Sequence, residues 1–65
     1  MTLQQMLQWG AGWLKEREVP EADLNAWYLL ADCFQMERSD YFLHQEEEAD
    51  AGKEKKFRQM IEKRG

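Results

Sequence analysis

One segment, from Pro20 to Met36, limits the possible folds of this 65-residue chain more than any other. Its apolar residues include Leu24, Ala26, Trp27, Tyr28, Leu30, Ala31, Cys33 and Phe34. They spread around most of the circumference of a helix, and only Asn25 and Asp32 form a narrow polar stripe. A helix that is apolar nearly all round is buried on several sides. We therefore predict that this segment is the central helix of the domain, with Trp27 in the core.

The start of this central helix is marked by Val19-Pro20. Proline is favourable in the first turn of a helix, where its missing N–H group needs no partner. Glu21 and Asp23 would then lie beside the positive end of the helix dipole. We expect the helix to begin at Pro20.

An amphipathic pattern precedes the central helix. Thr2 and Gln5 have the spacing of a capping box, in which each side chain accepts a hydrogen bond from the other residue's backbone N–H. At about 100° per residue, an apolar stripe forms on one face, with Trp13 at its edge. Gly10 lies in this stripe, so we expect close approach of another helix there; Trp9 lies beyond the margin, partly uncovered and available to a partner. The stripe consists of Leu3, Met6, Leu7, Gly10 and Leu14.

Two further helices are expected after the central one. Ser39 is a candidate N-cap for a short helix with the sequence DYFLHQ. We expect Tyr41 or Phe42, together with Leu43, to pack on the central helix. An acidic connection, EEEADAG, leads to the last helix, whose apolar residues recur at i, i+3 and i+4 before a base at i+7. These positions are Phe57, Met60, Ile61 and Arg64.

These patterns predict an all-α fold, with residues 1–65 forming a single domain. The expected architecture is a small antiparallel bundle of four short helices, five if the third is split, around the central apolar helix; short connections favour antiparallel neighbours. A chain of this size buries only about 60% of the surface that its unfolded form exposes. Cys33 is the only cysteine, so no intramolecular disulfide can form. We expect a monomer, and a homodimeric bundle is the alternative that would complete so thin a core.

Residues capable of catalysis or metal binding are few. His44 is the only histidine, and with the following glutamates it makes a poor ligand set, so a solvated turn is expected. Cys33 lies in the most apolar segment, where burial raises the pKa of a thiol and makes it unreactive. The chain has no glycine-rich phosphate loop, no G-x-S-x-G and no C-x-x-C motif. We predict no catalytic, cofactor-binding or metal-binding residue.

The net charge of −4 is distributed unevenly. Residues 1–50 hold eleven acids and three bases, a balance of −8, whereas residues 51–65 hold two acids and six bases, a balance of +4. An acidic body argues against nucleic acid as a partner, because phosphate neutralisation supplies most of that affinity. Neither a signal peptide nor an apolar run near the roughly 20 residues of a membrane span is visible. We expect a cytoplasmic protein with no nucleic-acid or membrane partner.

The order of these features resembles a known family. The segments PEADLNAWYLLADCF, MERSDYFLHQEEE and KKFRQMIEKRG are similar to the N-terminal helical domain of the bacterial protein-(glutamine-N5) methyltransferases that modify peptide chain release factors. In that family the second helix reads like DAExLLAHVLG. Asn25 stands where aspartate is usual, and Gln35 where glycine is common. The matching positions are Asn25-Ala26, Leu29-Leu30-Ala31, Phe34, Arg38, Phe42-Leu43 and Lys63-Arg64.

The resemblance implies a function through contact rather than catalysis. In the family, a following Rossmann-like domain binds S-adenosylmethionine and methylates a glutamine of the release factor, while the helical domain holds this protein substrate. The cofactor loop and the Asn-Pro-Pro-Tyr motif are absent from this sequence, so we expect an isolated N-terminal domain whose cofactor belongs to a missing catalytic domain. Candidate partner contacts are Trp9, Arg38, Lys63 and Arg64. The alternative is a free-standing helical interaction or regulatory module.

Overall fold

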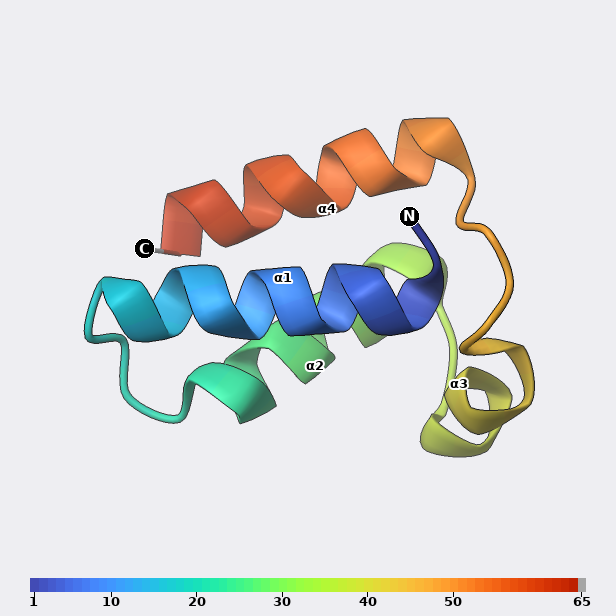
Figure 1. Cartoon of the computed structure of the whole chain (residues 1–65), viewed down its shortest axis with the longest axis horizontal. Coiled ribbons are helices and arrows are strands. Elements are labelled where there is room, and N and C mark those ends of the chain that lie inside the picture. The colour runs from blue at the N-terminus through green and yellow to red at the C-terminus, as the bar shows by residue number, and fades with distance from the viewer. Residues whose placement is uncertain (65) are drawn as a thin grey trace.

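A computed structural model of the chain describes residues 1–64, and the described part consists of four helices without a strand. The helices are α1 (Leu3–Glu16), α2 (Ala22–Phe34), α3 (Arg38–His44) and α4 (Ala51–Arg64). Figure 1 shows that α2 runs antiparallel to α1. By contrast, α4 lies beside α1 and runs parallel to it. The short α3 lies at one end of these three helices (Figure 1). The predicted all-α bundle of four helices is confirmed.

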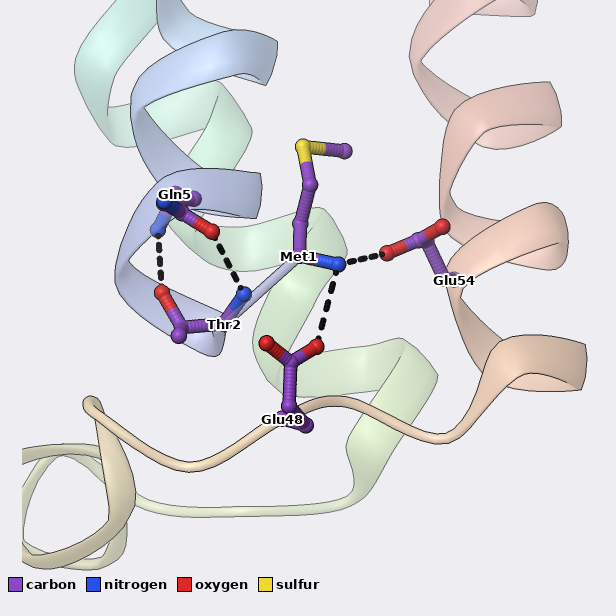
Figure 2. A network of polar contacts seen from close by, with 5 residues as sticks. All are labelled: Met1, Thr2, Gln5, Glu48 and Glu54. Atoms are coloured by element: carbon purple, nitrogen blue, oxygen red, sulfur yellow. Dashed lines mark hydrogen bonds and ion pairs between the residues drawn. The ribbon is translucent and has the colours of Figure 1, made fainter.

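The beginning of α1 follows the predicted capping box. The backbone N–H of Gln5 donates to Thr2 Oγ1 at 3.1 Å, and the N–H of Thr2 donates to Gln5 Oε1 at 2.9 Å (Figure 2). The predicted apolar stripe faces the core, although Leu7 is only half-buried. The buried residues of α1 are Leu3, Met6, Gly10, Ala11 and Leu14.

At Gly10, α4 packs closely against α1, in agreement with the predicted close approach of another helix. A Cβ atom at this position would lie 2.9 Å from Cζ of Phe57 and 3.0 Å from Cδ1 of Ile61. Both of these side chains are fully buried, so neither ring nor methyl group has free space to move into. Glycine is therefore required by packing at this contact.

Alanine substitutions at the two glycines of α1 are expected to have opposite effects on stability. Gly12→Ala should raise the free energy of unfolding by about 1 kcal/mol, because a Cβ there meets nothing within 4 Å and alanine has the higher helix propensity. Gly10→Ala gains the same propensity but adds the clash with Phe57, so a net loss is expected; overpacked sites cost about 1–3 kcal/mol. Urea denaturation of both variants measures the difference. Stabilisation by both would show that α1 and α4 are not in close contact.

The predicted start of the central helix at Pro20 is wrong by two residues. Glu21 has a left-handed backbone, with φ of 54°, and a right-handed helix cannot include that conformation. The helix therefore begins at Ala22. The side-chain amide of Asn25 donates to the carbonyl of Pro20 at 2.8 Å and to that of Glu21 at 3.1 Å, which stabilises the turn.

The prediction that α2 is buried on several sides is also wrong. α2 packs against both α1 and α4, but this covers only one of its faces. On the other side, Leu24 is 43% exposed and Tyr28 is 60% exposed, and Trp27 is half-buried at the margin of the core. The described chain has no further long helix to cover this face, so the apolar circumference exceeds what the fold can bury. The buried residues of α2 are Ala22, Ala26, Leu30 and Cys33.

α3 begins one residue before the predicted cap. Glu37 takes the N-cap position, and its backbone N–H donates to Oδ2 of Asp40 at 3.1 Å, so Ser39 lies within the first turn. Tyr41 is buried, as one of the two predicted alternatives requires. Leu43 is 76% exposed, so its predicted contact with the central helix is wrong. Only one face of this short helix reaches the bundle, and Tyr41 rather than Leu43 lies on it.

α4 completes the core with Phe57 and Ile61, both fully buried at the predicted spacing. The helix begins inside the segment expected to be a connection, and Asp50 Oδ2 accepts from the N–H of Lys53 at 3.0 Å. Cys33 is buried against this helix, and its thiol donates to the carbonyl of Lys53 at 3.3 Å. Burial raises the pKa of the Cys33 thiol, which fits the predicted packing role.

The first residue is held by the segment between α3 and α4 together with the first turn of α4. The α-amino group of Met1 lies 2.9 Å from Oε1 of Glu54 and 3.3 Å from Oε2 of Glu48 (Figure 2). Backbone hydrogen bonds continue the contact, with the N–H of Ala49 donating to the Met1 carbonyl at 3.0 Å and that of Leu3 to the Glu47 carbonyl at 3.2 Å. These contacts fix the α3–α4 connection, and with it the position of α3.

When Met1 carries an unmodified α-amino group, the free energy of unfolding is expected to fall in alkaline solution. Hydrogen bonds to Glu54 and Glu48 raise the pKa of this amine above its ordinary value of 8.0. A raised pKa in the folded state stabilises the fold fully below pH 8, and the stabilisation disappears as the pH rises through the folded-state pKa. Thermal melting from pH 7 to pH 10 measures this fall, and Glu54→Gln should make it smaller. An unchanged slope in Glu54→Gln would contradict the assignment.

Candidate protein-docking site

A surface groove of about 590 Å³ lies between α1, α2 and the start of α3. We call it the α2–α3 groove. It follows directly from the uncovered face of α2, since four residues from two successive turns of that helix line it. Its lining residues are Leu7, Asp23, Leu24, Trp27, Tyr28 and Arg38.

The floor of the groove is apolar and accessible. Leu24, Trp27 and Tyr28 occupy positions i, i+3 and i+4 of α2 and so share one side of the helix. Phe42 of α3 is 60% exposed and extends the apolar surface beyond Arg38. Exposed apolar clusters of this kind are typical of protein interaction sites in a small domain.

Arg38 is held in place by aromatic rings. Its guanidinium carbon lies 4.5 Å from the centre of the Trp27 ring and 5.7 Å from that of Phe42. Trp27 in turn packs edge-on against the buried Tyr41, with ring centres 5.4 Å apart. From the core to the surface, the successive contacts therefore run from Tyr41 to Trp27 and from Trp27 to Arg38. Burial raises the pKa of Tyr41, against an opposing effect of Arg38, so the phenol stays protonated at neutral pH.

The two charged side chains that line the groove, Asp23 and Arg38, do not form an ion pair with each other. Asp23 forms an ion pair with Lys15 of α1, with Oδ1 3.2 Å from Nζ. The Arg38 guanidinium, by contrast, has no carboxylate oxygen within 4 Å among residues 1–64. Tryptophan, tyrosine and arginine are the residues most enriched at binding hot spots, and the groove brings all three together.

Of the four predicted partner contacts, only Arg38 lies in this groove. Trp9 is half-buried on another face, edge-on to Phe57 with ring centres 6.3 Å apart. Arg64 donates to Oδ1 of Asn25 at 2.8 Å, and Lys63 is exposed on α4. The structure does not bring these residues together.

Leu24, Tyr28 and Phe42 were not predicted as site residues, because the sequence assigns the first two to the core. A signal was nevertheless present in the composition of α2, whose apolar side chains cover most of its circumference. A bundle with only three long helices cannot enclose one of them completely. An excess of apolar surface on the second helix therefore indicates an interaction face.

Metal-ligating groups do not converge anywhere in residues 1–64. His44 is exposed, and its Nδ1 lies 2.6 Å from Oε2 of Glu47, a contact that raises the pKa of the imidazole. No three histidine, cysteine or carboxylate side chains in the described chain could share a metal ion. No described helix has the length and apolar character to span a lipid bilayer.

The described residues also do not fit S-adenosylmethionine. Such a charged, polar cofactor needs buried polar groups or a backbone cradle at a strand end, and residues 1–64 contain neither a strand nor a buried polar side chain. The α2–α3 groove offers an open apolar surface instead. We derive no cofactor chemistry from this chain.

Comparison with known proteins gives one family. A family model described as the PrmC N-terminal domain matches residues 5–65, which is nearly the entire chain. No curated protein and no solved structure matches the chain significantly. The family match covers α1 from residue 5 onward, the other three helices and the whole α2–α3 groove.

Proposed function

The chain belongs to the PrmC N-terminal domain family, and from this membership we propose that it docks the protein substrate of a release factor methyltransferase. The parent enzyme would be an S-adenosylmethionine-dependent protein-glutamine N5-methyltransferase acting in the cytoplasm on peptide chain release factors. The cofactor and the catalytic residues belong, in this proposal, to a separate domain of that enzyme. The helical domain contributes contact alone.

The observation that carries this proposal is the exposed α2–α3 groove. A 65-residue domain has little apolar surface to spare, yet Leu24 and Tyr28 lie open beside an arginine that stacks on Trp27. Leaving such side chains exposed does not stabilise the domain. A protein partner that covers these side chains would account for their exposure.

Docking remote from the chemistry can promote a methyl transfer. Contacts outside the reacting centre supply the energy that orients the reacting atoms, and misplacement by about 1 Å can cost roughly 100-fold in rate. The uneven charge, −8 over residues 1–50 and +4 over residues 51–65, would also favour one orientation of the substrate during encounter. The domain would therefore act as a rigid positioning surface.

Deleting residues 1–64 from the parent enzyme tests the proposal. We expect kcat/KM for intact release factor to fall about 100-fold, because the factor loses its remote anchor. A short release-factor peptide that contains only the methylated glutamine and its neighbours should not reach the helical domain, so kcat/KM for this peptide should change little and reports any damage to the catalytic domain. Equal losses on both substrates would contradict a docking role.

A further inference from the structure

We propose that the α2–α3 groove recognises a protein segment in which a carboxylate lies beside an apolar side chain, and that Arg38 binds the carboxylate. The apolar side chain would enter the groove over Leu24 and Tyr28. This inference rests on the proposed docking function, and it states which chemistry the docked surface of the release factor must have.

Arg38 has the geometry of a prepared carboxylate receptor. The Trp27 ring, 4.5 Å from the guanidinium carbon, and the Phe42 ring, 5.7 Å from it, limit how far this long side chain can move. Cation–π contact engages the face of the guanidinium and leaves its N–H edges able to donate. A guanidinium fixed in this way loses less conformational entropy when it forms two parallel hydrogen bonds to a carboxylate.

No carboxylate of the described chain already occupies this position. Two of the nearby acids are engaged elsewhere: Asp23 pairs with Lys15 at 3.2 Å, and Asp40 accepts from the backbone N–H of Glu37 at 3.1 Å. In the remaining ion pairs of residues 1–64, Arg38 does not appear. Its charge is therefore available to a partner.

The surroundings favour a single carboxylate over a phosphate chain. Arg38 is one of only three bases among the first fifty residues, which also hold eleven acids. Nucleic acid needs several cations along its backbone, and among the residues that line the groove Arg38 is the one base. One carboxylate needs one arginine, so a protein segment fits better.

The apolar part of the groove defines the second half of the recognised pattern. Leu24 and Tyr28 are one helical turn apart on α2, and Trp27 of α2 and Leu7 of α1 also line the groove. The groove volume of about 590 Å³ lies within the range of roughly 300–1,000 Å³ that is typical of ligand-binding pockets. A leucine, methionine or phenylalanine side chain next to the carboxylate would cover the exposed surfaces of Leu24 and Tyr28.

Calorimetric titration of the 65-residue chain with a purified peptide chain release factor tests this inference. Arg38→Gln should raise Kd at least about tenfold, the amount expected for losing one hydrogen-bonded charge pair. Arg38→Lys keeps the charge but lacks the planar fork, so it should restore only a minor part of the affinity. Added salt should weaken the wild-type complex more than the Arg38→Gln complex.

Arg58→Gln is the matched control. Arg58 stacks on Trp9, with its guanidinium carbon 5.5 Å from the ring centre, and lies outside the groove. It has the same charge and the same kind of aromatic contact as Arg38, so its Kd should stay within about twofold of wild type if recognition is local. Unchanged melting temperatures in both variants would separate lost binding from lost folding.

The outcomes distinguish this inference from the proposed function. If release factor binds, Leu24→Asp abolishes binding, and Arg38→Gln leaves Kd unchanged, then the groove docks the factor but the carboxylate assignment is wrong. Equal weakening by Arg38→Gln and Arg58→Gln would also overturn the assignment, in favour of general charge attraction. If the wild-type chain does not bind release factor, the proposed function fails and this inference fails with it.

Discussion

Phe57→Ala is expected to unfold much of the domain, with a loss of about 3–5 kcal/mol in the free energy of unfolding. The Phe57 side chain is fully buried between α4 and α1, next to Gly10 and edge-on to Trp9. Gly10 has no side chain that could relax into the vacated space, so the cavity would persist. Natural domains have about 0.05–0.15 kcal/mol of stability per residue, which leaves a 65-residue chain little in reserve.

Phe42→Ala is the matched control for this substitution. Phe42 is 60% exposed, and its main contacts are an edge-on pair with Tyr41 at 5.7 Å and the Arg38 guanidinium. Losing one aromatic pair should cost no more than about 1.5 kcal/mol. Urea denaturation followed by tryptophan fluorescence compares the two variants. Similar midpoints for both would show that α4 does not pack on α1 through Phe57.

Leu30→Ala is expected to cost about 2–5 kcal/mol. Leu30 is fully buried on the one covered face of α2, which packs against both α1 and α4. Truncation at this position leaves a cavity in the face of α2 that the other two long helices cover. The melting transition of the variant should therefore move to much lower temperature, or disappear, in circular dichroism.

The same substitution at Leu43 provides the comparison. Leu43 is 76% exposed on α3, so Leu43→Ala should change the free energy of unfolding by no more than about 0.5 kcal/mol. Both variants lose the same atoms, and only burial differs. If Leu43→Ala were as harmful as Leu30→Ala, α3 would have to pack on the bundle through a different face from the one described.

Features of the fold that depend on local spacing could be predicted from the sequence. The Thr2–Gln5 capping box needs only two side chains three residues apart, and both hydrogen bonds are present. The contact of Gly10 with α4 follows from a glycine within an apolar stripe. Phe57 and Ile61 face the core because positions i and i+4 share one side of a helix.

Features that depend on how many elements surround a residue could not be predicted in this way. The pattern of α2 shows that it is apolar nearly all round, but not that only α1 and α4 are available to cover it. Leu24 and Tyr28 were therefore assigned to the core and are exposed instead. The helix starts were displaced because Glu21 adopts a left-handed backbone and Glu37 precedes Ser39 as the cap.

The candidate site was predicted in part. Arg38 was identified through its place in the family pattern, and the structure adds its stacking on Trp27 and its position in the groove. The remaining predicted contacts, Trp9, Lys63 and Arg64, lie outside this groove and stay predictions. Periodicity alone cannot bring α2 and α3 together, because their relative placement depends on long-range contacts such as Trp27 on Tyr41.

The central claim, that the α2–α3 groove is the docking surface, is tested most directly by amide chemical-shift mapping. Isotope-labelled chain would be titrated with unlabelled release factor, and the perturbed amides assigned to residues. We expect the largest perturbations at residues 23–28 and 38–42, with little change at Gln59, Glu62 and Lys63 on the exposed side of α4. Perturbations confined to α4, with residues 23–28 unaffected, would contradict the account.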